Sequence, residues 1–204
     1  IQDEPNIHYI GTKEVEQSRD SYFSHNAIST HGQLIRNNIH VKYSGENCDC
    51  DIDGMYCVRG TDLIDNHLLV DHAVPRCESN QLYKGIIDDR ATGVFNGKIV
   101  VRQDAQQTNA YQSNKNVLLS KRATINTKPQ LEIFADDVEC SHGATSGQLD
   151  ELSKFYMNTR GIPDQLAKSL LTYAHLSEVI DRVQIPDLRD YLDQHLKDQL
   201  EIML

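Results

Sequence analysis

The chain of 204 residues contains no tryptophan and only three methionines, and hydrophobic residues make up 39% of it. A typical globular domain has roughly 45–50% apolar residues. This shortage implies a thin core with a large surface relative to its interior, as in an elongated fold. The length suits one substantial domain, or one domain followed by a short helical region.

Positive charge and long hydrophobic runs are also scarce. Asp and Glu number 30 against 20 Lys and Arg, so the formal net charge is -10. Because such a chain repels a phosphate backbone, we expect no nucleic-acid partner. The longest apolar runs, such as Val117-Leu118-Leu119, fall far short of the about 20 residues that span a bilayer, and we expect no membrane partner.

Several motifs of catalysis and nucleotide binding are missing. The segment Gly93–Lys98 resembles a phosphate-binding loop, but Ile99 follows where that motif requires Ser or Thr, so the chain is not expected to bind ATP by itself. It also lacks the His-Glu-x-x-His and Gly-x-Ser-x-Gly motifs. Their absence excludes the commonest zinc-protease and hydrolase interpretations.

Disulfide staples are not indicated by the cysteine content. The number of cysteines is odd, and no Asn-x-Ser/Thr glycosylation site occurs; the cysteines are Cys48, Cys50, Cys57, Cys77 and Cys140. A chain of this length can fold without disulfides. We therefore expect reduced thiols and a cytoplasmic location, or the plastid stroma if the source is a photosynthetic eukaryote.

Short β-strand signals dominate the first two thirds of the chain. From Ile7 to about Cys140, clusters of β-branched and aromatic residues alternate with Asn, Asp, Gly, Ser and Thr, and none is long enough for a helix. Asp53-Gly54 and Asn96-Gly97 are typical turn sequences. Strict hexapeptide repeats are absent, so this pattern leaves a β-sandwich and a β-solenoid equally open.

The hydrophobic period changes after Gly143. Apolar residues then recur at helical spacing over residues 149–156, which predicts a helix with Thr145 or Ser146 as its N-cap and Gly161 as its stop signal.

Two further helices are predicted beyond it. One begins near Pro163 and runs to about Val183, and the other begins at Pro186, because proline is tolerated in a first helical turn. The expected organisation is thus a β region over residues 1–143 and a helical region over residues 144–204.

The segment Cys140-Ser141-His142-Gly143 is a candidate metal site. If it is extended, Cys140 and His142 project to the same side, about 6.5–7 Å apart along the strand. A thiolate and an imidazole are suitable ligands for iron, zinc or an iron–sulfur cluster, but two ligands do not complete a four-coordinate site. The remaining ligands would come from elsewhere in the fold or from another chain. The alternative is a small buried cysteine beside a surface histidine.

Several segments together resemble the SufD branch of the SufB/SufD family of iron–sulfur cluster assembly proteins. The resemblance covers about residues 65 to 162. The segments that carry it are residues 71–77, 81–85, 93–98, 112–116, 127–133, 135–138 and 140–145. Cys-Ser-His-Gly-Ala-Thr favours SufD, because SufB members carry a Glu-His-Glu-Ala-like sequence there. Residues 1–64 resemble the family only loosely, and most of the upstream part of a full-length member is missing, so we expect an N-terminally truncated piece.

The resemblance implies a fold and a function. The fold would be a right-handed parallel β-helix followed by a C-terminal helical region. The chain would be a non-catalytic scaffold subunit of a SufBCD complex, pairing with SufB through the β-helix and with the SufC ATPase through the helices. A homodimer is expected to be accessible when SufB is absent.

Site residues also follow from the resemblance. Cys140 and His142 would ligate iron or a nascent iron–sulfur cluster transiently, at an interface shared with SufB, and no cofactor would be needed for folding. Glu178 and Val179 would lie near the SufC contact, with plain helix packing as the alternative.

Two other classes of function remain as alternatives. A β-solenoid enzyme acting on polysaccharide or acyl groups would need carboxylates that converge on one solenoid face; the candidates are Asp88-Asp89 and Asp136-Asp137, which are also typical turn caps. A metal-binding module of the double-stranded β-helix kind would need a His-x-His motif with a distant Glu and His.

Overall fold

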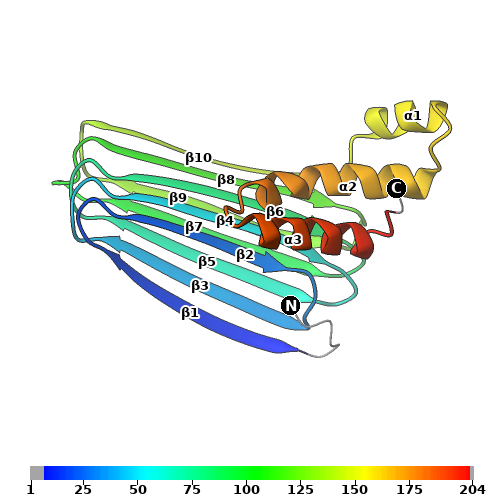
Figure 1. Ribbon diagram of the computed structural model, residues 1–204, viewed down its shortest axis with the longest axis horizontal. Coiled ribbons are helices and arrows are strands. Elements are labelled where there is room, and N and C mark those ends of the chain that lie inside the picture. Colours follow the sequence, from blue (N-terminus) through cyan, green and yellow to red (C-terminus); the bar gives the residue numbers. More distant parts are fainter. Residues whose placement is uncertain (1–6, 203–204) are drawn as a thin grey trace.

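A computed structural model describes residues 7–202 of the chain. Ten strands are followed by three helices (Figure 1). The strands are β1 (His8–Gln17), β2 (Tyr22–Ser29), β3 (Leu34–Tyr43), β4 (Asp49–Val58), β5 (Leu63–His72), β6 (Glu78–Ile87), β7 (Thr92–Val101), β8 (Thr108–Leu118), β9 (Thr124–Ile133) and β10 (Val138–Gly147). The helices are α1 (Glu151–Thr159), α2 (Asp164–Asp181) and α3 (Pro186–Gln199).

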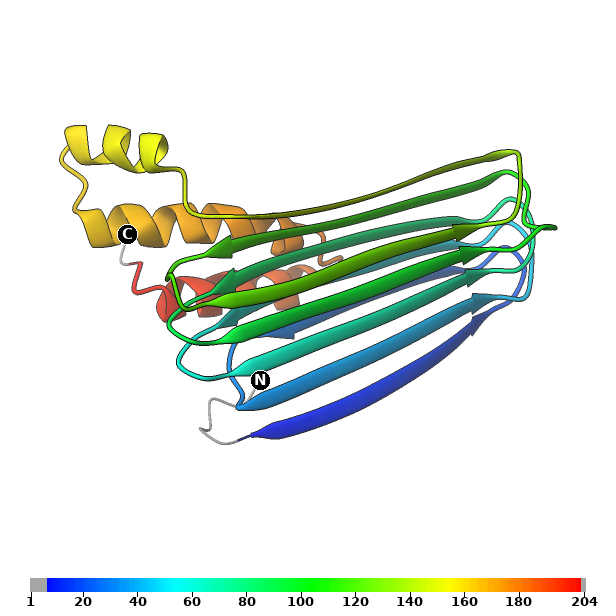
Figure 2. The same cartoon turned by 180° about the vertical axis from the view of Figure 1, so that it is seen from behind.

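The strands form two parallel sheets of five. One has the order β1-β3-β5-β7-β9 and the other β10-β8-β6-β4-β2, so each coil of the chain contributes one strand to each sheet. Equivalent residues stack in register from coil to coil, as in the column Val41, Val70, Ile99 and Leu131. The fold is therefore a parallel β-helix of about five turns, which confirms the predicted fold class (Figures 1 and 2).

The core of the β-helix is one cluster of inward-facing side chains from both sheets. Along β5 and β7, buried and half-buried residues alternate over the whole strand. The inward side chains of Ile64, Val70, Phe95 and Ile99 have no exposed surface. Because alternate residues of a strand face opposite sides, half of each strand can stay polar, which explains the low hydrophobic content.

Helices α2 and α3 cover the outer face of the second sheet over β4 and β6 (Figure 1). These two strands are accordingly buried on both faces over much of their length. Outward-facing Met55 and Leu82 pack against Leu176 and Leu196 of the helices. No helix among the described residues is long and apolar enough to cross a lipid bilayer.

One corner of the β-helix repeats the same backbone conformation in four successive coils. Four residues there have φ near +60°: Asp20, Asn47, Arg76 and Gln107. Each lies two positions before one of the aligned strand residues Tyr22, Asp49, Glu78 and Asn109. The left-handed conformation is common for Asp and Asn, but not for Arg or Gln. Stacking on the neighbouring coils therefore imposes it at Arg76 and Gln107.

Two predicted turns are strand interiors instead. Asp53-Gly54 lies within β4 and Asn96-Gly97 within β7. A Cβ at Gly54 would lie 2.2 Å from the ring of Tyr83. This glycine makes room for a large inward side chain of the next coil, a role that the dipeptide alone does not indicate.

The junction of the two regions also differs from expectation. Strand β10 pairs with β8 as far as Gly147, so the β region continues past residue 143 and includes Thr145 and Ser146. Neither caps α1: its N-cap is Asp150, whose side chain accepts a hydrogen bond from the backbone N–H of Leu152. The predicted N-cap is wrong because the backbone of Thr145 and Ser146 continues the β-ladder.

Candidate functional site

Strand β10 is an open edge of the second sheet. It pairs with β8 on one side and has no neighbouring strand on the other among the described residues. Every residue from Ser141 to Gly147 is exposed, and an added Cβ at Gly143 or Gly147 would meet no atom within 4 Å. An edge with unpaired backbone groups and small side chains is suited to pairing with another chain.

Cys140 and His142 both lie on this edge strand. They are two residues apart, so their side chains project to the same face, and they stack on Ala110 and Gln112 of β8. Cys140 is half-buried and packs against the inward-facing core, which identifies the shared face as the inner one. The imidazole of His142 is exposed at the open end.

The chemistry of this pair is that of an incomplete metal site. Burial raises the pKa of the Cys140 thiol, although a hydrogen bond from the backbone of Ala110 acts in the opposite direction. Within residues 7–202, no three His, Cys, Asp or Glu side chains are grouped so that they could hold a metal ion. The pair supplies a thiol and an imidazole, and further ligands would have to come from outside this part of the chain.

Two glutamines that no sequence motif indicated align with His142 in the preceding coils. Residues that align from coil to coil form a rung of the β-helix. Gln112 of β8 and Gln81 of β6 lie on the same rung as His142 of β10. Both side chains are 3% exposed, and Nε2 of Gln112 donates a hydrogen bond to Oε1 of Gln81 at 2.8 Å. The two glutamines are 31 residues apart, which is close to the length of one coil, and this spacing is the feature of the sequence that could have predicted their stacking.

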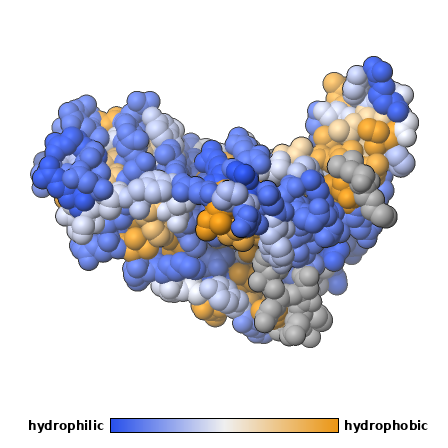
Figure 3. Space-filling model, viewed as in Figure 1, coloured by the Kyte–Doolittle hydropathy of each residue, from blue (hydrophilic) through white to orange (hydrophobic). Residues whose placement is uncertain are grey.

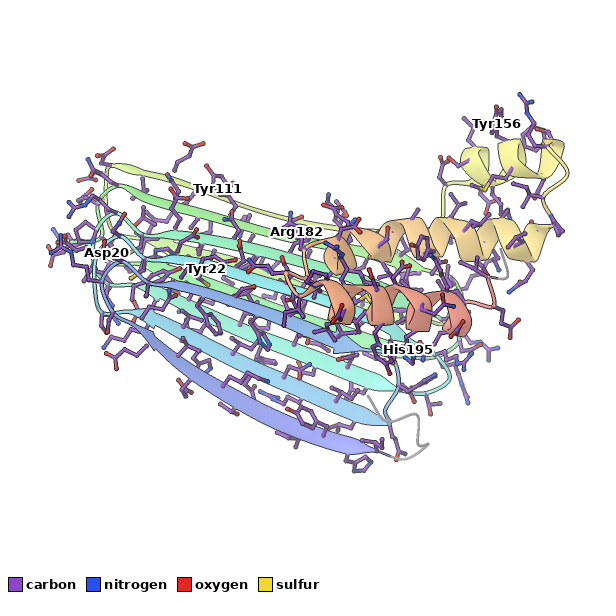
Figure 4. The ribbon with its side chains drawn as sticks, in the orientation of Figure 1. Asp20, Tyr22, Tyr111, Tyr156, Arg182 and His195 are labelled. Atoms are coloured by element: carbon purple, nitrogen blue, oxygen red, sulfur yellow. The ribbon has the colours of Figure 1, made fainter. Side chains whose placement is uncertain are left out.

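Helix α1 presents a second candidate surface. None of its residues is buried, and the side chains of Leu152, Phe155 and Tyr156 are 79%, 65% and 60% exposed. They lie at i, i+3 and i+4, which places them on one face of the helix. Figure 3 shows hydrophobic surface where Figure 1 places α1, and Figure 4 shows Tyr156 far from the sheets.

The predicted pair Glu178 and Val179 lies in α2, on its side toward the sheet. Val179 has no exposed surface and belongs to the core between the helices and β4 and β6. Glu178 forms a hydrogen-bonded ion pair with Lys84 of β6. The hydrogen bond from Lys84 is the main reason why the pKa of Glu178 is lowered. In this structure both residues hold α2 on the sheet, and only Glu178 keeps an exposed part of its side chain.

The other cysteines and the carboxylate pairs lie away from the edge. Cys50 and Cys77 are buried in the core, and burial raises their pKa to about 12 and about 11. Asp88-Asp89 follows β6 and Asp136-Asp137 follows β9, so the two carboxylate pairs lie at opposite corners of the coils. They do not converge on one face, as a glycosidase would require.

Comparison with known proteins identifies the family. A family profile described as "SUF system FeS cluster assembly, SufBD core domain" matches residues 1–175. The iron–sulfur cluster assembly protein SufD of Escherichia coli is 36% identical over 186 residues, which cover 91% of this chain and 44% of that protein. A SufBD family protein of Synechocystis sp. is 37% identical over 186 residues, covering 91% of this chain and 41% of that protein.

A plant relative extends the comparison. The Arabidopsis thaliana protein named "Protein ABCI7, chloroplastic" is 38% identical over 186 residues, covering 90% of this chain and 39% of that protein. The chain thus spans less than half the length of each of these three relatives. On its profile match and these identities, the chain belongs to the SufBD core domain family of the SUF system for iron–sulfur cluster assembly.

Proposed function

We propose that this chain is a non-catalytic scaffold subunit for iron–sulfur cluster assembly. It pairs with SufB through the edge of its β-helix, binds the SufC ATPase through its C-terminal helices, and presents Cys140 and His142 to iron or a nascent cluster, which is the cargo. We assign this role to the cytoplasm, or to the plastid stroma in a photosynthetic eukaryote.

The open edge of β10 supports the pairing with SufB. A second β-helix that presents a matching edge would satisfy the unpaired backbone groups of β10 and continue the sheet across the interface. Apolar surface adjoins this edge, since Phe134 and Ile133, at the end of β9, are 62% and 41% exposed. When SufB is absent, the same edge is free to pair with a second copy of this chain.

The half-built ligand set supports the role in cluster assembly, and it is the observation that carries the proposal. A thiol and an imidazole share one face of an edge strand, at the place where a second chain would dock. Two more ligands from that second chain would complete a four-coordinate site. Release of the cargo would then require only that the two subunits separate at the edge.

The exposed apolar face of α1 supports the binding of SufC. Such a face, with aromatic side chains at helical spacing, suits insertion into a groove of a partner protein. This chain has no phosphate-binding loop, so the ATPase activity is assigned to SufC. Movements driven by nucleotide in SufC would then reach the β-helix through α2, which is bound to the sheet.

The proposal is tested by co-expressing the chain with SufB and SufC and reconstituting the complex anaerobically with iron and sulfide. Cys140→Ala and His142→Ala are expected to form the complex and to hold at least tenfold less cluster, measured by iron content and visible absorbance. Ser141→Ala is the matched control, because Ser141 lies between them and projects to the opposite face. Normal cluster content in both site variants would refute the ligand role.

A further inference from the structure

Gln81 and Gln112 form a short ladder of amides inside the β-helix. They stack in adjacent coils, both are almost fully buried, and a hydrogen bond of 2.8 Å joins Nε2 of Gln112 to Oε1 of Gln81. In a ladder of this kind, each amide directs its NH2 group to one neighbour and its oxygen to the next. The hydrogen bond therefore fixes the direction in which both amides point.

Both ends of this ladder lack a hydrogen-bond partner. Nε2 of Gln81 and Oε1 of Gln112 are buried atoms without a partner among the described residues. The NH2 group of Gln112 is used by its bond to Gln81 of β6, so only its oxygen is left for the coil on its other side. The residue on that rung of the following coil is His142.

The opposite sheet keeps Gln112 in place. A Cβ at Gly97 of β7 would lie 2.4 Å from Nε2 and 2.8 Å from Cδ of Gln112, so glycine at this position gives the amide its space. The amide thus has a fixed position and one unused acceptor atom, and the residue aligned with it on the neighbouring strand is His142, whose side chain is exposed. A buried acceptor without a donor is costly, and a ring N–H of His142 is a suitable donor within the same rung.

We propose that Gln112 is a positioning residue for His142, an inference that rests on the proposed function. One ring N–H of His142 donates a hydrogen bond to Oε1 of Gln112, which selects one tautomer and leaves the lone pair of the other ring nitrogen free for the cargo. Histidine ligands of metals generally have such a partner on their second nitrogen. Gln81 holds Gln112 in the correct orientation through the ladder.

The tautomer of His142 provides a test that needs neither metal nor partner. The protein is labelled with nitrogen-15 at histidine, and the signals of His142 are assigned by comparison with His142→Gln. The wild type is expected to show a single neutral tautomer of His142. Gln112→Met removes the acceptor at similar volume and is expected to give the tautomer mixture of an exposed histidine, whereas Gln112→Glu retains an acceptor oxygen and should restore the single tautomer.

Ser113→Ala is the matched control, because Ser113 follows Gln112 on β8 and projects to the opposite face of the strand. It should leave the tautomer of His142 predominantly single. If Gln112→Met does not fold, Gln112→Asn provides the test instead. Its shorter amide cannot reach the imidazole of His142, so this variant should also show a mixture of His142 tautomers. A tautomer mixture in the wild type, or an unchanged single tautomer in a folded Gln112→Met or Gln112→Asn, would overturn the proposal.

Iron binding by the complex separates this inference from the proposed function. If both are right, Gln112→Met weakens iron binding by about 10–100-fold, the usual effect of removing such a partner, and Gln112→Glu restores most of it. If His142→Ala leaves iron binding unchanged while the tautomer still depends on Gln112, the positioning stands and the ligand role of His142 fails. If His142→Ala abolishes binding and Gln112→Met changes neither binding nor tautomer, only the positioning fails.

Discussion

Lys84 of β6 and Glu178 of α2 form an ion pair in which the lysine side chain is only 7% exposed, while that of the glutamate is 47% exposed. The pair therefore joins the buried surface of the sheet to the half-exposed border of the helix–sheet contact. Removal of one partner leaves a buried ammonium group without a counter-charge, which costs more than the pair itself contributes.

Glu178→Ala is expected to lower the free energy of unfolding by about 1–3 kcal/mol, because the buried side chain of Lys84 loses its partner. The double variant Lys84→Met with Glu178→Ala should recover part of this loss. Glu132→Ala is the control, since its pair with Lys98 is more evenly exposed and should contribute about 0–1 kcal/mol. Urea unfolding measures all of these, and equal losses for Glu178→Ala and Glu132→Ala would contradict the expectation.

Asp53 makes stability depend on pH in the weakly acidic range. Burial raises its pKa from 3.8 to about 6, although Arg182, whose Nη1 lies 3.2 Å from a carboxylate oxygen, acts in the opposite direction (Figure 4). The folded protein therefore binds a proton more tightly than the unfolded chain does. This contribution to stability is present below the unfolded value and is lost as the pH rises through about 6.

The check is a series of unfolding curves between pH 4 and pH 7 for the wild type and Asp53→Asn. The wild type should lose stability relative to Asp53→Asn as the pH rises through this range, because only the wild type has to ionise a buried carboxyl group. Parallel pH profiles for the two proteins would show that the environment of Asp53 does not shift its titration.

Lysines on the edge of β10 should block assembly without unfolding the chain. Gly143 and Gly147 have no atom within 4 Å of an added Cβ, so Gly143→Lys with Gly147→Lys is expected to change stability by less than about 1 kcal/mol. Charged side chains on an edge oppose strand pairing, and co-purification with SufB should fall at least tenfold. Thr12→Lys, on exposed β1 at the other end of the solenoid, is the control and should co-purify normally.

Phe155→Ser should weaken the binding of SufC and leave folding unchanged. Phe155 is 65% exposed, so the isolated chain loses little buried surface, whereas an aromatic anchor in an interface typically contributes more than about 1 kcal/mol. A dissociation constant raised by about tenfold, measured by titration of the chain with SufC, is the expected result. Glu151→Gln, elsewhere on α1, should bind as the wild type, and equal affinities for all three proteins would exclude this face as the contact.

The local pattern predicted a strand-rich region followed by three helices but misassigned two glycines. Strand signals and helical spacing depend on neighbouring residues, so the change of period near residue 143 could be read directly. Gly54 and Gly97 were expected in turns because Asp-Gly and Asn-Gly favour them. Their actual role depends on Tyr83 and Gln112, which are far away in the sequence but lie beside them in the lumen.

The geometry of the candidate site depends on both local and long-range features. That Cys140 and His142 would share a face followed from the period of two in a β-strand, and their place on β10 is consistent with it. That β10 would be an open edge, and that Gln112 would lie beneath His142, depends on the pairing of strands about 30 residues apart. No local pattern contains that register.

Composition and the spacing of near neighbours are enough to predict strands before helices, a thin core, and a thiol and an imidazole on one face. Which strands stack, which edge of the sheet stays open, and that Val179 is buried while Phe155 is exposed are known only from the folded structure. These features depend on coil stacking, which satisfies backbone hydrogen bonds between residues distant along the chain. The register of that stacking therefore places Ala110 and Gln112 beside Cys140 and His142.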